Sequence, residues 1–310
     1  MSWNERDLGD WTGRTVVITG ANSGIGLAAA TVLARHGAHV QLACRDPRRA
    51  ADAARRIPGS TTAALDLSDL DSVAAFQAPD RIDALVCNAG VMGGVYLPSP
   101  QGHERQMATN HLGHALLVKQ LWSQLEESRG RVVVVSSIAA RGGRLTAAST
   151  AQDLVDPQPY EGQQVYANTK QANLLYAQEL HRRAVAVGSP VSAVVVHPGV
   201  SNTALFSRQQ VDSGHPRLAP LAKAVGAIAF SSARAGARPT LRGLDAMTPS
   251  GAFVGPRLLG QARGRPHLLA VYASGRDPAV GRRLWELTEQ VLGTRLPPVH
   301  HDAAVNPPQR

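Results

Sequence analysis

A tyrosine and a lysine stand four residues apart in the stretch Tyr-Ala-Asn-Thr-Lys that runs from Tyr166 to Lys170. Residues at this spacing share one face of a helix, so both side chains would point to the same side. A tyrosine hydroxyl is a poor acid or base at its ordinary pKa of about 10. A nearby ammonium favours the phenolate and lowers that pKa. The spacing therefore predicts Tyr166 as a general acid/base tuned by Lys170, although the pair alone is equally compatible with an exposed helix face.

A glycine-rich turn follows the first apolar run, and its spacing is G-x-x-x-G-x-G. Glycines allow a tight turn and a close approach of the backbone to a pyrophosphate. A helix beginning near Gly24 would add free N–H groups and a positive dipole end. A glycine run alone is also compatible with a plain tight turn, but this one lies in the first strand-to-helix unit, where a dinucleotide site needs it. The expected contacts are Gly20, Asn22, Ser23, Gly24, Ile25 and Gly26.

The end of the second apolar run indicates which dinucleotide would bind. A site for NAD has an acidic residue at this place, where it bonds the ribose 2′-hydroxyl. Here Cys44 takes that place and Arg45 follows it. An arginine can pair with a 2′-phosphate, so we expect NADP(H) to be favoured over NAD(H). Asp46 is the alternative ribose ligand, although it also has the features of an N-cap before Pro47.

Short apolar runs alternate with helical patterns along the chain. Apolar strands separated by helices predict an α/β fold with a parallel sheet covered on both faces. We expect a single doubly wound Rossmann fold with a parallel sheet of about seven strands. The runs that carry this prediction are Thr15–Thr19, His39–Ala43, Ala84–Cys87, Val132–Ser136, Val191–Val196 and Gly251–Val254.

The helical patterns and loops suggest one domain over residues 1–297. The stretch from Arg141 to Gly162 is expected to be a long loop, and such loops are usually functional. Residues 138–162 would form an insertion at the active site, 204–248 would cover the substrate, and 298–310 would be a disordered tail. Helices are expected from Gly24 to His36, from Pro47, after Ser68, from Gly102 to Glu127, from Gln163 to Val187, and from Ala279 to Leu292.

The composition limits the class of protein. The chain has 310 residues, of which 44% are hydrophobic and 18% charged, as in an ordinary globular protein with a sizeable core. Two cysteines exclude a disulfide scaffold, and no histidine spacing suggests a metal. The net charge is +9, but 4% aromatic residues supply few stacking platforms for nucleic acid. Without a long apolar stretch or secretory signal, we expect a cytoplasmic protein with no membrane partner. The arginine and alanine content is typical of a bacterial, GC-rich source.

Four motifs together resemble the short-chain dehydrogenase/reductase family. They are the turn from Thr19 to Gly26, the triplet Asn88-Ala89-Gly90, the Tyr166–Lys170 pair, and Pro198-Gly199 with Thr203. Their order and separations match the family over about residues 12–293. The resemblance implies an oxidoreductase that transfers a hydride between a nicotinamide cofactor and its substrate.

The resemblance also implies a catalytic group of four residues. Ser137 would hydrogen-bond the substrate oxygen and stabilise alkoxide character, with Ser136 as the alternative hydroxyl. Asn110 is similar to the family's helix-kinking asparagine, which is expected to hold a water beside the lysine. The implied set is Asn110, Ser137, Tyr166 and Lys170.

Further cofactor contacts follow from the same resemblance. His197, beside Pro198, is expected to be packed rather than to act as a base. The expected contacts are Asp66 and Leu67 at the adenine, Asn88, Ala89 and Gly90 under the ribose, Tyr166 and Lys170 at the nicotinamide ribose, and Val200 and Thr203 at the carboxamide and phosphates.

Several features resemble the retinol dehydrogenase-like branch, which includes WW-domain oxidoreductases and protochlorophyllide reductases. They are 28 residues between Ser137 and Tyr166, about twice the usual number, the Cys44-Arg45 pair, the Asn-His-Leu-Gly-His motif that starts at Asn110, and the segment Leu284–Leu287. Ile138–Arg141 lacks the histidine often found there, so retinol itself is not the expected substrate.

The predicted reaction is hydride transfer between NADP(H) and the carbonyl or alcohol of an apolar small molecule, with Tyr166 moving the proton. One alternative is reduction of a C=C bond at the same site. Another is a catalytically silent NADPH-binding scaffold or sensor. In relatives the helices that bear Asn110 and Tyr166 form a dimer interface, so a homodimer or homotetramer is expected, with a monomer as the alternative.

Overall fold

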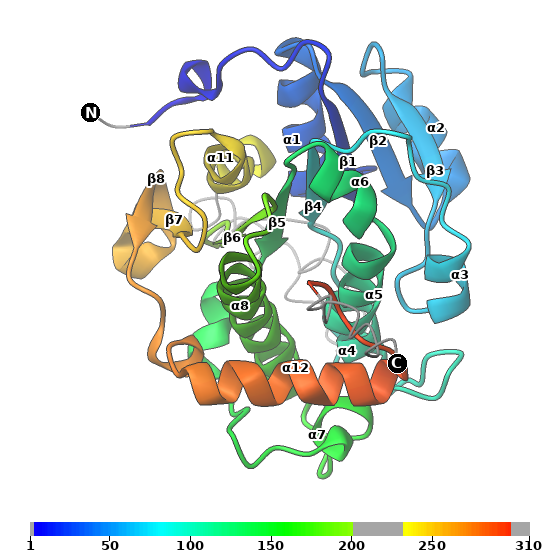
Figure 1. The fold of residues 1–310 in the computed structure, drawn as a ribbon, viewed down its shortest axis with the longest axis vertical. Coiled ribbons are helices and arrows are strands. Elements are labelled where there is room, and N and C mark those ends of the chain that lie inside the picture. The colour runs from blue at the N-terminus through cyan, green and yellow to red at the C-terminus, as the bar shows by residue number, and fades with distance from the viewer. Residues whose placement is uncertain (1–2, 201–231, 299–310) are drawn as a thin grey trace, which may run out of the picture.

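An eight-stranded sheet forms the centre of the protein (Figure 1). The structure, a computed structural model, describes residues 3–200 and 232–298. The strand order is β3-β2-β1-β4-β5-β6-β7-β8; the first seven strands are parallel and β8 is antiparallel to β7. The expected doubly wound α/β fold is therefore confirmed. The strands are β1 Thr15–Thr19, β2 His39–Cys44, β3 Thr61–Ala64, β4 Ala84–Cys87, β5 Arg131–Val135, β6 Ser192–Val196, β7 Phe253–Leu258 and β8 Arg263–Leu269.

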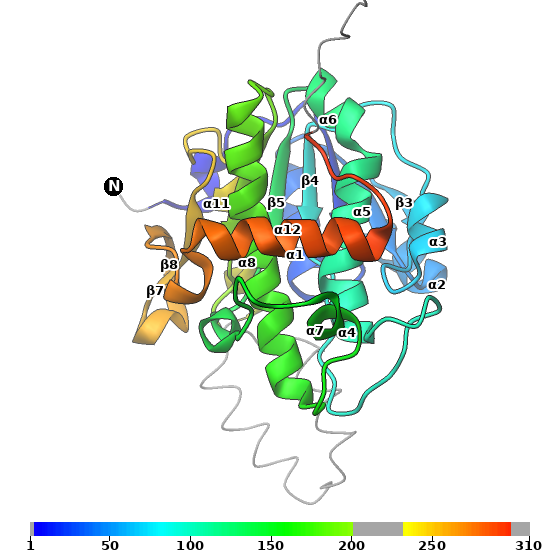
Figure 2. The same ribbon diagram turned by 60° about the horizontal axis from the view of Figure 1, so that its bottom comes forward.

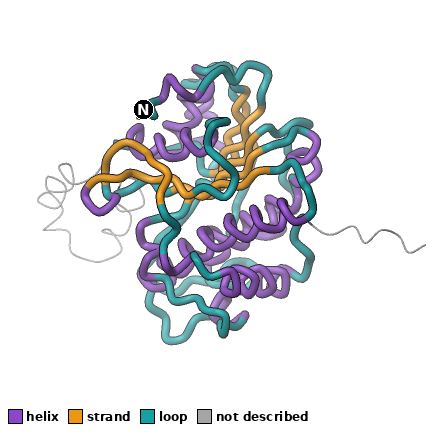
Figure 3. The backbone as a smooth tube through the Cα atoms, turned by 60° about the vertical axis from the view of Figure 1, so that its left-hand side comes forward, coloured by secondary structure: helices purple, strands orange, loops and turns teal. Residues whose placement is uncertain are grey.

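Helices cover both faces of this sheet (Figure 3). Alternate side chains of a strand enter opposite cores: Val17 of β1 lies in one core, whereas Val16 and Ile18 lie in the other. Because both faces are buried, the strands are apolar throughout rather than alternating. The first core is closed by α3 Leu70–Ala74, α4 Arg105–Met107, α5 Gly113–Gln120, α6 Trp122–Glu127, α8 Gly162–Ala186 and α12 Pro278–Leu292, and the second by α1 Gly24–Arg35, α2 Pro47–Ala54 and α11 Ala233–Leu244.

Local signals account for most helix boundaries. The Asp46 side chain accepts a hydrogen bond from Arg49 N and caps α2, whose first residue is Pro47. Gly293, with a left-handed φ of 61°, ends α12. The helix expected from Gly102 instead begins at Arg105 and contains a π-helical turn over Ala108–Leu112. Within the two described ranges, no helix is long and apolar enough to span a membrane.

Three elements were not expected from the sequence. β3 is a mostly exposed edge strand of small residues, and β8 contains arginine, glycine and proline. Their pairing with apolar neighbours overrides these weak strand propensities. The segment expected as a loop contains the short helix α7 Ala151–Val155. β7 begins at Phe253, two residues after the predicted start, and residues 204–231 of the expected substrate cover lie outside the described residues.

Helix α12 lies across α8 (Figure 2). Its Trp285 stacks on Tyr176 of α8 with ring centroids 5.4 Å apart, and the Arg183 guanidinium lies 4.5 Å from the centre of the indole. Thr288 of α12 is 2.9 Å from Nε2 of His111. The C-terminal part of the chain therefore covers the outer side of α8 where α12 crosses it, at Tyr176 and Arg183.

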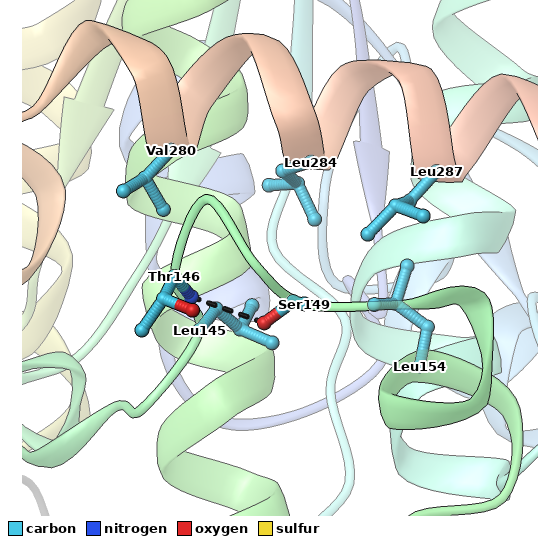
Figure 4. A pocket seen from close by; sticks show the side chains of 7 residues that line it. All are labelled: Leu145, Thr146, Ser149, Leu154, Val280, Leu284 and Leu287. Atoms are coloured by element: carbon cyan, nitrogen blue, oxygen red, sulfur yellow. Dashed lines mark hydrogen bonds between the residues drawn. The ribbon is translucent and has the colours of Figure 1, made fainter.

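The same helix packs on the segment that contains α7 (Figure 4). Thr146 N donates to Ser149 Oγ, 3.0 Å away, which closes a turn below α12. No water-sized space remains between the apolar side chains here, so this contact is a packed junction. It is lined by Leu145, Thr146, Ser149, Leu154, Val280, Leu284 and Leu287.

Replacement of Trp285 by alanine tests how far α12 holds the fold together. Its side chain is 1% exposed, so Trp285→Ala should lower the free energy of unfolding by about 3–5 kcal/mol in a urea titration. The control is Met247→Ala, because Met247 is 88% exposed and its loss should change stability by less than about 0.5 kcal/mol. Equal stability of the two variants would contradict the packing role of α12.

Candidate active site

The expected site residues meet at one edge of the sheet. β1 leads to Gly20, β2 to Arg45, β4 to Asn88 and β5 to Ser137. These strands are parallel, so their carboxyl ends lie on the same side. The strand order changes direction between β1 and β4, and open α/β sheets bind ligands at such a point.

The turn between β1 and α1 has the shape of a phosphate cradle. Gly20 and Gly24 have positive φ angles of 65° and 58°. A Cβ atom on Gly26 would lie 2.6 Å from Asn88 Nδ2, so only glycine fits there. Ser23 is the N-cap of α1 but its side chain makes no capping hydrogen bond. In the described part of the chain, no side chain caps the N-terminus of α1, which fits a dinucleotide pyrophosphate at this place.

Thr19 connects this turn to the triplet after β4. Its Oγ1 accepts hydrogen bonds from Asn88 N and Ala89 N, each with a length of 2.9 Å. Asn88 Nδ2 donates to Thr19 O at 2.8 Å. A Cβ atom on Gly20 would lie 3.0 Å from Ala89 Cα, so the two turns are in close contact. Asn88 and Ala89 therefore fix the spacing between β1 and β4.

His114 extends the same network to Asn110. Its Nδ1 lies 3.1 Å from Asn110 O and its Nε2 lies 2.9 Å from Thr19 Oγ1. A carbonyl only accepts, so Nδ1 carries the proton and Nε2 accepts from the Thr19 hydroxyl. Burial lowers the pKa of His114 to about 4, which keeps the ring neutral near pH 7. The sequence prediction assigned no role to the side chains of Thr19 and His114, because these two residues are distant in sequence.

Asn110 lies in the π-helical turn between α4 and α5 and is fully buried. Its Oδ1 accepts from Val91 N over 2.8 Å, and its Nδ2 donates to Val91 O and to Thr169 Oγ1. A Cβ on Gly90 would lie 3.2 Å from Asn110 Oδ1 and 3.4 Å from Lys170 Nζ. Asn110 thus braces the loop after β4 beside the lysine.

Ser137, Tyr166 and Lys170 come together between β5 and α8. The Ser137 side chain lies close enough to the Tyr166 hydroxyl to favour its phenolate, and Lys170 Nζ lies 5.8 Å from the centre of the Tyr166 ring. Lys170 Nζ donates to Val135 O over 3.2 Å. The alternative hydroxyl, Ser136 Oγ, is buried and donates to Lys170 O over 2.6 Å. Ser137 is therefore the serine that faces Tyr166.

Burial sets the proton affinities of this pair. It raises the pKa of Tyr166 to about 12, against a lowering by the neighbouring Ser137 side chain. It lowers the pKa of Lys170 to about 8, because the ammonium is 4% exposed. The expected net lowering of the Tyr166 pKa does not occur in this ligand-free arrangement, because burial raises the pKa and the effect that opposes burial comes from Ser137.

The end of β2 presents an exposed arginine beside an aspartate. Arg45 Nε lies 4.0 Å from Asp66 Oδ2, and the Arg45 side chain is 60% exposed. Asp66 Oδ1 also accepts from Ser68 N and Oγ, and Leu67 is buried against Gly113. Asp46 is committed to capping α2, as described above.

The Cys44 thiol, in the place of an acidic ribose ligand, lies near the backbone N–H groups of Ala21 and Asn22, which favour the thiolate. Burial raises its pKa, so it stays a neutral thiol. The Cys44 side chain therefore packs against the turn after β1.

The turn after β6 completes the edge. Gly199 has a φ of 76°, and Val200 N donates to Ala262 O over 2.9 Å. His197 is fully buried, in agreement with its predicted packing role. Thr203 lies outside the described residues. Within the described residues, no group of three or more His, Cys, Asp and Glu side chains is arranged to hold a metal ion.

Comparison with known proteins identifies the family. Residues 14–151 match the family model for short chain dehydrogenases. The chain is 35% identical to mouse retinol dehydrogenase 14, over 93% of this chain and 88% of that protein. It is 36% identical to the bovine dehydrogenase/reductase SDR family member 13, over 93% and 75% of the two chains. The protein belongs to the short-chain dehydrogenase/reductase family, in the retinol dehydrogenase-like branch, and is an NAD(P)-dependent oxidoreductase acting on CH–OH donors.

Two solved structures share this fold. A crystal structure of an uncharacterized protein from Mycobacterium paratuberculosis is 37% identical and superposes with a TM-score of 0.79, covering 96% of this chain and all of that one. The L-sorbose reductase of Gluconobacter frateurii, solved with NADPH and L-sorbose, shares the fold at 21% identity and a TM-score of 0.62, over 80% and 95% of the two chains.

The buried ammonium of Lys170 should lower the stability of the ligand-free protein. Its pKa is about 8 in the folded state against 10.5 in the unfolded chain, so the unfolded chain holds the proton more tightly. The resulting cost, of about 3 kcal/mol at most, is complete below pH 8 and disappears as the pH rises to 10.5. Lys170→Met should therefore raise the free energy of unfolding by about 1–3 kcal/mol at pH 7, with a smaller gain at pH 10.

Urea titrations of the ligand-free protein at the two pH values measure this difference. Lys119→Met, at an exposed position, is the matched control and should change little at either pH. A gain for Lys170→Met that is independent of pH, or a loss at pH 7, would contradict the linkage.

Proposed function

We propose that this protein is an NADP(H)-dependent carbonyl reductase or alcohol dehydrogenase in which Tyr166 is the general acid/base. The observation that carries this proposal is that Tyr166 lies beside both the Ser137 side chain and the buried Lys170 ammonium. A silent scaffold would have no need to bury that ammonium, since burying a charge is costly. The same site meets the open N-terminus of α1 at one sheet edge.

The described residues can hold the cofactor along this edge. The turn from Gly20 to Gly26 would hold the pyrophosphate, and Asn88, Ala89 and Gly90 would lie under the ribose. Asp66 and Leu67 would flank the adenine, while Val200 would meet the carboxamide. Lys170 would bond the nicotinamide ribose. The bound dinucleotide supplies or accepts the hydride.

The side chains of this chain would manage the proton and the substrate oxygen. Ser137 would donate a hydrogen bond to that oxygen and stabilise negative charge on it. Tyr166 would give its proton to the same oxygen during reduction and take it back during oxidation. Lys170, beside the phenol ring, would stabilise the phenolate after the proton leaves. Asn110 would hold a water beside Lys170 and so connect the site to solvent.

The substrate is proposed to be an apolar carbonyl compound or alcohol. Relatives named retinol dehydrogenases support an alcohol or carbonyl as the reacting group. Reduction of a C=C bond is the alternative, in which Tyr166 would protonate carbon. Incubation with a conjugated enone separates the two: an allylic alcohol product supports the main proposal, and a saturated ketone supports the alternative. A cytoplasmic location and a bacterial source stay predictions.

Replacement of Tyr166 by phenylalanine tests its acid/base role. Tyr166→Phe removes only the hydroxyl, so kcat for an apolar aldehyde or ketone should fall by about 10²–10⁴-fold. NADPH affinity, measured by titration calorimetry, should stay within about threefold of wild type because the ring remains. Tyr176→Phe, in the core beneath α12, is the control and should retain activity. Turnover by Tyr166→Phe at the wild-type rate would overturn the mechanism.

The cofactor preference is proposed to depend on Arg45, whose exposed guanidinium would pair with the 2′-phosphate. Arg45→Ala should weaken NADPH binding by about 10- to 100-fold, since hydrogen bonds to charged groups contribute about 1.5–3 kcal/mol. NADH binding should change little, and calorimetry with each cofactor measures both. Arg56→Ala, exposed just beyond α2, is the control. Equal losses for the two cofactors, or a wild-type preference for NADH, would contradict the role of Arg45.

A further inference from the structure

A chain of hydrogen bonds connects the turn after β6 to the β7–β8 hairpin. Gly199 N donates to His197 Nδ1 over 3.2 Å. Because Nδ1 accepts, the neutral imidazole carries its proton on Nε2, which lies 3.2 Å from Tyr272 Oη. The Tyr272 hydroxyl in turn donates to Gln261 Oε1 over 2.6 Å. Each hydrogen bond in this series therefore has a fixed donor and a fixed acceptor, from Gly199 N at one end to Gln261 Oε1 at the other.

This direction is stable because His197 stays neutral. The ring is fully buried, and burial lowers its pKa to about 4, with the positive charge of Arg141 acting in the same direction. A side chain at Gly255 would collide with the imidazole, so glycine leaves the space that the ring fills. The hydrogen bonds through His197 therefore keep the same donors and acceptors across the neutral pH range.

Tyr272 is held in place by contacts on both sides of its ring. The Arg141 guanidinium lies 4.7 Å from the ring centre, and Phe253 packs edge-on with centroids 4.8 Å apart. Arg141 belongs to the 3₁₀ turn Ile138–Gly142 that follows Ser137. Ser274, two residues after Tyr272, donates to Ala140 O of that turn over 2.7 Å. Tyr272 thus lies between the segment after the proposed catalytic serine and the turn after β6.

The hairpin turn that receives this chain holds Val200 directly. Val200 N donates to Ala262 O over 2.9 Å, and Gly199 approaches the same carbonyl so closely that a Cβ would collide with it. Gln261 has a φ of 76°, a costly conformation for a residue other than glycine. The hydrogen bond from Tyr272 stabilises the turn in that conformation and so fixes the Ala262 carbonyl.

We propose that Tyr272 is a positioning residue that, through His197 and Gln261, sets the Gly199–Val200 turn against the nicotinamide half of the cofactor. This inference rests on the proposed function, in which Val200 meets the carboxamide. The adenosine half would bind at α1 and Arg45, on the other side of the switch point. It would not contact the hydrogen-bonded series from Gly199 to Gln261.

The test compares two ligands that share the adenosine half. Titration calorimetry measures the binding of NADPH and of adenosine 2′,5′-bisphosphate, which lacks the nicotinamide. Tyr272→Phe keeps the ring and loses the hydroxyl, so NADPH binding should weaken by about three- to tenfold, as expected for one net hydrogen bond, while the fragment binds as in wild type. Tyr176→Phe is the matched control: the buried Tyr176 hydroxyl has no hydrogen-bond partner among the described residues, so both affinities should be unchanged.

A second variant, Gln261→Asn, keeps an amide that tolerates the left-handed conformation but is too short to reach Tyr272. Gln261→Asn should also weaken NADPH binding. If Tyr272→Phe does not fold, this variant tests the proposed role of the Tyr272–Gln261 hydrogen bond. Wild-type NADPH binding by both variants would overturn the inference. Equal weakening of both ligands would also overturn it, because it would show a general structural role. Failure of the wild type to bind either ligand would instead overturn the proposed function.

Discussion

The buried ammonium of Lys170 is the constraint around which the site is arranged. A charge at 4% exposure needs hydrogen-bond acceptors and a fixed position. Val135 O accepts from Nζ, and the same carbonyl accepts from Asn173 Nδ2. Ser136 Oγ holds the carbonyl of Lys170 itself, so α8 is tied to the end of β5 at three points. These bonds hold the Tyr166 side of α8 against Ser137, and this is the geometry that the proposed proton transfer requires.

Several buried polar groups at the sheet edge are hydrogen-bonded to one another. Thr19 Oγ1 receives two backbone N–H groups and donates to His114, which donates to Asn110 O. A network in which each group is satisfied is rigid, because breaking one bond leaves a buried group without a partner. The glycine turn and the Asn110 turn are thereby held in register, although they lie on different strands and helices.

Helix α12 adds a second layer of support. It covers the outer side of α8 through Trp285 and packs on the segment of α7. The dimer interface expected from relatives, formed by the helices that bear Asn110 and Tyr166, would need the outer side of α8, and α12 crosses that side at Tyr176. The long segment between Ser137 and Tyr166 is accordingly tied down by Gln171, whose amide bonds Leu145 N, Leu145 O and Ser274 O.

The sequence by itself determined the parallel α/β sheet, the glycine turn, the end of α12 and the Tyr166–Lys170 face, because these features follow from short-range periodicity and local backbone preferences. It left Ser136 and Ser137 as alternatives, missed β3, β8 and α7, and gave Thr19, His114 and Tyr272 no role. Only the tertiary structure decided these points. β8 exists because β7 offers it a partner, and His114 is fixed by Thr19, which is 95 residues away. Partners so distant in sequence are brought together by packing, and packing also sets the burial that moves the pKa values of Tyr166 and Lys170.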